Sequence, residues 1–140
     1  MTTNRITISA VVNADNQTTW DCYTAPEHIT QWNFADDSWH CPSASNDLRV
    51  GGSYIARMEA KDGSFGFDFQ ATYDEIDPLH RLAYTLGDGR TVIVYFKAVG
   101  SNKTEVVVDF AAENTNPIEM QRQGWQAILD NFKKYTEGRG

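Results

Sequence analysis

The chain has 140 residues, a length that favours a single domain over residues 1–140. It carries 12 Lys and Arg against 19 Asp and Glu, a formal net charge of -7, and its basic residues are scattered, which argues against nucleic acid and anionic membranes as partners. The amino terminus has no apolar run long enough for a signal peptide or a spanning helix, so we expect a cytoplasmic protein without membrane insertion.

The first third of the sequence predicts one strand followed by two short helices. Residues 5–13 alternate apolar and polar side chains, the period of a half-buried strand. Asp15 or Asn16 can cap a first helix, and the segment 26–32, opened by a proline, predicts a second. Residues 33–46 show no regular period. A loop of that length is a candidate functional segment.

Five consecutive strands are predicted in the middle of the chain. Short turns rich in Gly, Asp, Asn or Pro separate them, among them an Asp-Gly hairpin signal at residues 88–89. Strands joined by such tight turns pair antiparallel, as a meander. The predicted strands cover residues 53–60, 65–76, 81–86, 91–99 and 104–112.

A long amphipathic helix is predicted to begin near residue 117. Its inward stripe recurs every three or four residues and consists of Ile118, Gln121, Trp125, Ile128, Leu129, Phe132 and Tyr135. The order of elements predicts an α+β fold in which a curved antiparallel sheet of about six strands wraps around this C-terminal helix. One helix cannot fill a strongly curved sheet unless large side chains reach in, so we expect a cavity between the two layers.

Five short motifs, spread over nearly the whole chain, form a combination typical of one protein family. They are Trp20 with Pro26-Glu27-His28 and Trp32, then Asp47-Leu48-Arg49-Val50-Gly51-Gly52, residues 71–78, residues 81–85, and Gly124-Trp125. This combination resembles the bacterial activator-of-heat-shock-protein-90-ATPase-like family. The resemblance implies a helix-grip (SRPBCC) fold with a hydrophobic cavity, as in START lipid-transfer domains and the birch-pollen allergen. The chain departs from the family pattern at Asn33, where an aromatic or apolar residue is expected.

Such a resemblance implies no single activity. The superfamily includes lipid carriers, hormone receptors and polyketide cyclases, and a fold does not by itself give a function. It also suggests a chaperone-assisting role, for which the residues themselves offer no support.

The segment Ser38–Pro42 places Trp39, His40 and Cys41 side by side. Neighbouring side chains in an extended segment point apart, so a Cys-His nucleophile pair is not predicted, and we assign no catalytic residue. No spacing of Cys, His, Asp or Glu matches a metal-binding motif, so we predict no metal and no cofactor. Instead, Trp39 or His40 is predicted to turn toward the mouth of the cavity, with Cys41 packed as a small apolar group.

We therefore predict a protein that binds a hydrophobic small molecule between sheet and helix. Phe65 is expected to share this interior. The predicted pocket residues are Trp32, Trp39, His40, Tyr54, Met58, Phe67, Phe69, Tyr84, Phe96, Gln121, Trp125 and Leu129.

Four alternatives stay open at this stage. The aromatic interior can be a solid core, the protein can be an enzyme that uses His40 or a buried acid as general base, or it can be an interaction module. An outer apolar patch of Ile93, Tyr95 and Val107 can also support a homodimer.

Overall fold

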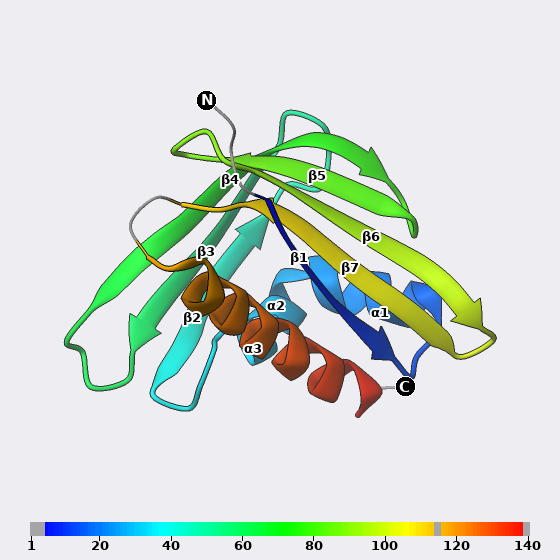
Figure 1. The fold of residues 1–140 in the computed structure, drawn as a ribbon, viewed down its shortest axis with the longest axis horizontal. Helices are drawn as coiled ribbons and strands as arrows, with labels where there is room; N and C mark the ends of the chain where they lie inside the picture. Colours follow the sequence, from blue (N-terminus) through cyan, green and yellow to red (C-terminus); the bar gives the residue numbers. More distant parts are fainter. Residues whose placement is uncertain (1–4, 114–115, 139–140) are drawn as a thin grey trace.

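Seven strands and three helices make up the part of the chain that the structure describes. The structure is a computed structural model, and it describes residues 5–113 and 116–138. In chain order the elements are β1 (Arg5–Val12), α1 (Asn16–Thr24), α2 (Pro26–Trp32), β2 (Trp39–Asn46), β3 (Ser53–Ala60), β4 (Gly66–Asp77), β5 (Arg81–Leu86), β6 (Thr91–Gly100), β7 (Lys103–Ala111) and α3 (Ile118–Glu137) (Figure 1).

The strands form one antiparallel sheet in the order β1-β7-β6-β5-β4-β3-β2. The sheet curls over α3, and α1 and α2 lie at one end of the curl (Figure 1). Helix α3 packs mainly on β1, and α2 packs on β2. The predicted α+β helix-grip fold is therefore confirmed, including the two short helices after the first strand. No helix among the described residues is long and apolar enough to cross a membrane.

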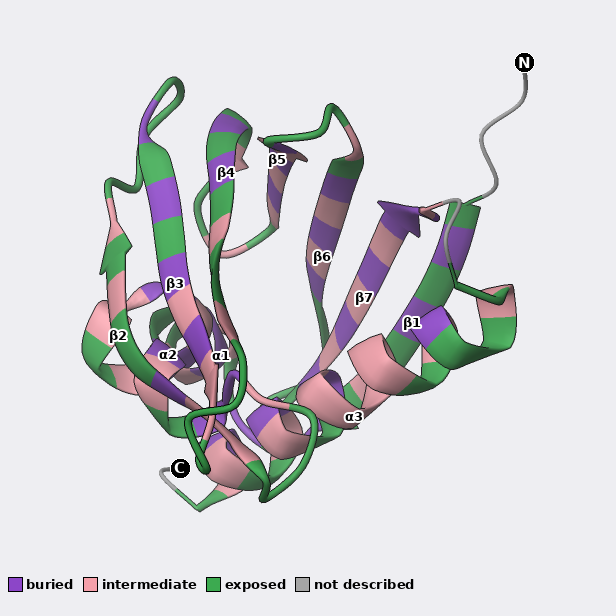
Figure 2. Ribbon diagram, turned by 90° about the vertical axis from the view of Figure 1, so that its left-hand side faces the viewer, coloured by how far each residue is buried: buried purple, intermediate pink, exposed green. Residues whose placement is uncertain are grey.

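Alternating burial along the strands explains how the sheet makes its concave core. On β6, Val92, Val94 and Phe96 are buried, whereas Ile93 and Tyr95 between them are only partly covered. The same banding runs along β3, β5 and β7 (Figure 2). Because strand side chains alternate between faces, each strand contributes every second residue to the space that α3 closes.

The prediction of a loop over residues 33–46 is wrong for the second half of that segment. Residues Trp39–Asn46 form β2, an edge strand paired with β3, so the sheet has one strand more than predicted. The sequence WHCPSASN lacks apolar alternation, and Pro42 has no N–H for a ladder hydrogen bond. A proline fits here because the strand lies at the edge and its register with β3 shifts between His40 and Ser43.

Gly51 and Gly52 make the bend that leads into β3. Gly51 has φ +84°, and a Cβ atom on Gly52 would lie 2.0 Å from the carbonyl oxygen of Asp47. The bend is fixed to β4, since Gly51 N–H donates to the Tyr73 carbonyl at 2.8 Å and Tyr73 N–H donates to the Gly52 carbonyl at 3.0 Å. The backbone therefore cannot move away easily from an added side chain.

We expect Gly52→Ala to lower the free energy of unfolding by about 2–4 kcal/mol, because the new methyl group collides with backbone. The matched control is Gly87→Ala, where nothing lies within 4 Å of the added Cβ. That change should be neutral or slightly stabilising. Urea unfolding of both variants measures the difference, and equal midpoints would show that the bend relaxes freely.

Candidate functional site

A pocket of about 180 Å³ lies between the sheet and the helices. Its sheet side is formed by Ile8, Tyr54, Met58, Phe67, Phe69, Tyr84 and Val108. Its helix side is formed by Tyr23, Trp32, Asn33, Trp125, Ile128 and Leu129. Asn33 and the tyrosine hydroxyls bring the main polar groups to an otherwise apolar or aromatic lining. None of these described lining residues is Asp, Glu, His, Lys or Arg.

The helix wall of the pocket follows from the period of α3. Trp125, Ile128 and Leu129 are three or four positions apart, so they share the face turned toward the sheet. The Trp125 indole stacks on the Phe110 ring of β7, with centroids 4.0 Å apart and planes at 11°. This stacking holds the largest side chain of the helix in one orientation beside the pocket.

Aromatic rings from three strands form the opposite wall. The Tyr54 ring on β3 lies 5.7 Å from Phe69 on β4 and 5.9 Å from Tyr84 on β5, in both cases edge to face. Tyr23, on α1, closes the helix side, with its ring centroid 5.2 Å from that of Trp32. Edge-to-face packing of this kind adds stability beyond the buried area, so the wall is well fixed.

Burial raises the pKa of each tyrosine in this wall. The pKa values of Tyr54 and Tyr84 lie well above the usual value, first because of burial and then because an ionised Tyr23 would repel their phenolates. Tyr23 keeps part of its surface accessible because it faces the pocket, but burial still raises its pKa. All three hydroxyls therefore stay protonated at neutral pH.

The pocket reaches the surface beside the β3–β4 hairpin. Phe67 lines the pocket and is 43% exposed, so it belongs to the pocket and the surface at once. Trp39 of β2 packs edge-on against Phe67 and Phe65, at centroid distances of 6.1 and 5.9 Å. Phe65, expected in the interior, is 61% exposed because it precedes β4 in the hairpin turn. These three rings form an aromatic cluster at the mouth.

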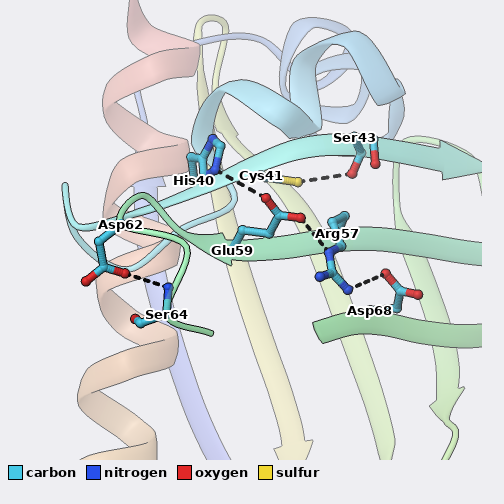
Figure 3. Close-up of polar contacts among 8 residues, drawn as sticks. All are labelled: His40, Cys41, Ser43, Arg57, Glu59, Asp62, Ser64 and Asp68. Atoms are coloured by element: carbon cyan, nitrogen blue, oxygen red, sulfur yellow. Dashed lines mark hydrogen bonds and ion pairs between the residues drawn. The ribbon is translucent and has the colours of Figure 1, made fainter. Parts of the chain in front are cut away.

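Polar residues near the mouth lie on the outer face of β2, β3 and β4 (Figure 3). The His40 Nε2 atom is 3.7 Å from a Glu59 carboxylate oxygen, and Glu59 accepts a 2.8 Å hydrogen bond from Arg57 Nε. Arg57 also contacts Asp68 at 3.4 Å. All four side chains are at least one-third exposed, so these pairs contribute little to stability. His40 thus faces Glu59, away from the pocket.

Cys41 does not face His40 as a partner. Its thiol is buried and donates a weak hydrogen bond to the Ser43 carbonyl at 3.4 Å (Figure 3), and burial raises its pKa, which disfavours the reactive thiolate. Within residues 5–113 and 116–138, no group of three or more His, Cys, Asp or Glu side chains gathers that could hold a metal ion.

The structure separates the predicted pocket residues into two sets. Those placed around the pocket are Trp32, Tyr54, Met58, Phe67, Phe69, Tyr84, Trp125 and Leu129. Those placed outside its lining are Trp39, His40, Phe96 and Gln121. Trp39 and His40 lie in the edge strand β2, which the sequence pattern does not predict. Trp39 is at the mouth of the pocket, and His40 is on the outer face of the sheet.

Phe96 and Gln121 point inward as predicted but meet other protein groups. Helix α1 covers Phe96, whose ring lies 5.1 Å from Trp20 and 5.4 Å from Tyr23. The Gln121 amide bonds to two residues ahead of α3, accepting from Glu113 N–H at 2.9 Å and donating to the Asn116 carbonyl at 2.8 Å. Both side chains are therefore used in packing the fold.

Five lining residues were not predicted as pocket residues. Ile8 and Val108 face each other across β1 and β7, and Ile128 lies in the helix stripe, so strand and helix periods could have identified all three. Tyr23 carries no such signal, and Asn33 stands out only as the position where the chain departs from the family pattern. Their positions depend on how α1 and α2 dock on the curled sheet, which no local pattern encodes.

Comparisons with known proteins agree with this architecture. The sequence model of the family described as "Activator of Hsp90 ATPase homolog 1-like protein" matches residues 13–137. A comparison with curated proteins finds no match. The solution NMR structure of an AHSA1-like protein from Aeromonas hydrophila is similar at 39% identity and a TM-score of 0.91, over 98% of this chain and 94% of that one.

Two further solved structures are similar over nearly the full length. A protein from Cytophaga hutchinsonii shares 44% identity at a TM-score of 0.83, over 96% of this chain and 93% of its own. A protein from Chromobacterium violaceum has a TM-score of 0.85 over 96% of this chain and 98% of its own, but only 20% identity, so it shows the fold alone.

Proposed function

Because the chain belongs to the family of activator of Hsp90 ATPase homolog 1-like proteins, we propose that it is a small-molecule-binding protein whose ligand occupies the space between the sheet and α3. The observation that carries the proposal is the pocket of about 180 Å³ with an apolar and aromatic lining. A concave, mostly apolar site with a few polar groups is the usual design of a small-molecule site.

The lining supports binding more strongly than catalysis. A general base has to reach the proton that it removes, and His40, the predicted candidate, is paired with Glu59 outside the pocket. The titratable groups in the lining are tyrosines, whose raised pKa values keep them protonated. They can orient a ligand by hydrogen bonding, but they are poor proton acceptors near pH 7.

The size of the pocket limits the ligand and its affinity. An apolar cavity of about 150 Å³ holds one benzene ring, so this pocket of about 180 Å³ fits one ring with a small substituent. Burying about 150 Å² of such a molecule would gain about 4 kcal/mol, or a Kd of about 1 mM. Hydrogen bonds between the pocket and a natural ligand would add to this binding free energy and lower the Kd.

The test is an NMR titration of the protein with toluene as an apolar probe. We expect shifts that saturate with a Kd of about 1 mM and that concentrate at Trp125, Phe69 and Leu129. In Ile128→Trp the indole should fill the pocket and weaken binding at least tenfold, because the space for the probe is gone. Shifts scattered over the surface, or none, would remove the proposal.

The matched control for pocket filling is Ile55→Trp. Ile55 lies on the outer face of β3 and is 36% exposed, so the same substitution adds an indole away from the pocket. This variant should bind toluene as the unmodified protein does. If Ile55→Trp and Ile128→Trp weaken binding equally, the effect comes from general destabilisation, and the proposed site is wrong.

A further inference from the structure

Three tyrosine hydroxyls in the pocket lack a hydrogen-bond partner in the described protein. Tyr23, Tyr54 and Tyr84 line the pocket from α1, β3 and β5. Within residues 5–113 and 116–138, no hydrogen bond joins their hydroxyls to another protein group. None of the three oxygens is among the polar atoms that are both sealed from water and unpartnered. They therefore face space that a ligand atom can enter.

In this arrangement the hydrogen-bond partners of the hydroxyls have to come from what enters the pocket, either water or a ligand. Tyr54 and Tyr84 are 8% and 4% exposed, so water reaches them mainly through the pocket itself. Phenylalanine would fill the same wall without a hydroxyl whose hydrogen bond has to be made by water or by a ligand. Three tyrosines from three separate elements are better explained by a hydrogen-bonding ligand than by packing.

The lining also determines the charge of that ligand. It contains no Lys, Arg or His that could pair with an anion, and no Asp or Glu that could pair with a cation. Moving an unpaired ion into such a site costs far more than moving a neutral polar group. Protonated phenols donate hydrogen bonds, and a neutral carbonyl oxygen can accept two of them.

We propose that the pocket selects a neutral single-ring compound with a carbonyl oxygen, which accepts one hydrogen bond from the Tyr54 hydroxyl and one from the Tyr84 hydroxyl. The proposal rests on the proposed function, since it assigns a ligand class to the same pocket. The ring would lie against Phe69 and Trp125, and the oxygen would point toward the tyrosines.

Three probes of similar shape test the ligand class in one NMR titration series. Acetophenone carries the carbonyl, α-methylstyrene replaces that oxygen by a methylene group, and benzoate replaces the neutral group by an anion. We expect acetophenone to bind about threefold to tenfold more tightly than α-methylstyrene, the range for one net hydrogen bond. Benzoate should bind at least tenfold more weakly than acetophenone, because it enters without a counter-charge.

The variant Tyr54→Phe/Tyr84→Phe removes two hydroxyls and keeps both rings. We expect it to bind acetophenone and α-methylstyrene equally, with its α-methylstyrene affinity unchanged. Its midpoint of urea unfolding should stay close to that of the unmodified protein, because neither hydroxyl bonds to another described protein group. Tyr95→Phe is the control, since Tyr95 lies on the other face of β6 and outside the pocket lining.

The outcomes distinguish a failure of this inference alone from a failure of the proposed function. If all three probes fail to bind, the proposed function and the inference both fall. If α-methylstyrene binds as tightly as acetophenone, or benzoate binds best, the pocket holds ligands but the neutral carbonyl class is wrong. If the preference for acetophenone survives in Tyr54→Phe/Tyr84→Phe, these two hydroxyls do not recognise the oxygen.

Discussion

Above pH 10 the protein should lose stability steeply, by about 1.4 kcal/mol per pH unit for each buried tyrosine that keeps its proton. Burial raises the pKa of Tyr23, Tyr54 and Tyr84, and it raises the pKa of Tyr73 to about 12. In the unfolded chain these phenols titrate near pH 10. Between pH 10 and 12 the unfolded state therefore releases protons that the folded state keeps, and rising pH favours unfolding.

The full stability is present below pH 10, where both states hold these protons. For four tyrosines the loss reaches about 5.6 kcal/mol per pH unit, which is enough to unfold a typical domain before pH 12. Urea unfolding at intervals from pH 9 to pH 11 measures the slope, and absorbance at 295 nm reports phenolate formation. In Tyr84→Phe the slope should be about one quarter smaller. Gradual phenolate absorbance in a fully folded protein would contradict the prediction.

Periodicity explains why most of the fold is visible in the sequence. Strand alternation places Val92, Val94 and Phe96 on one face, and the spacing of Trp125, Leu129 and Phe132 turns one helix face inward. These patterns are local and depend only on backbone geometry. The edge strand β2 does not show these patterns, because one of its faces is solvated and its pairing with β3 is interrupted at Cys41-Pro42.

The pocket is less visible in the sequence than the fold. Every inward side chain belongs to the core pattern, and only docking decides which of them face empty space. Phe96 meets α1 and is covered, whereas Tyr84, with the same alternation one strand away, faces the pocket. The difference lies in the position of α1 and α2 against the curled sheet, a tertiary property set by contacts such as that of Trp32 with Phe132.

Replacement of Phe132 by alanine should lower the free energy of unfolding by about 3–5 kcal/mol. Phe132 has no exposed surface, and it lies where all three helices meet. Its ring packs edge to face against Tyr23 of α1 and Trp32 of α2, at centroid distances of 5.0 Å in both cases. Alanine would leave a cavity beneath both rings, and neither backbone can close it, because α1 and α2 also pack on the sheet. Urea unfolding at pH 7 measures the loss.

Phe65→Ala is the matched control, since it deletes the same atoms from a side chain that is 61% exposed. It removes the ring contacts with Trp39 and Phe67, so we expect a loss of about 1 kcal/mol or less. The two variants also differ in what they do to the pocket. Phe132→Ala should release Tyr23 and Trp32, which line the pocket, and weaken toluene binding even where the protein is still folded. Unchanged binding in folded Phe132→Ala would mean that the sheet and α3 alone shape the pocket, without the two short helices.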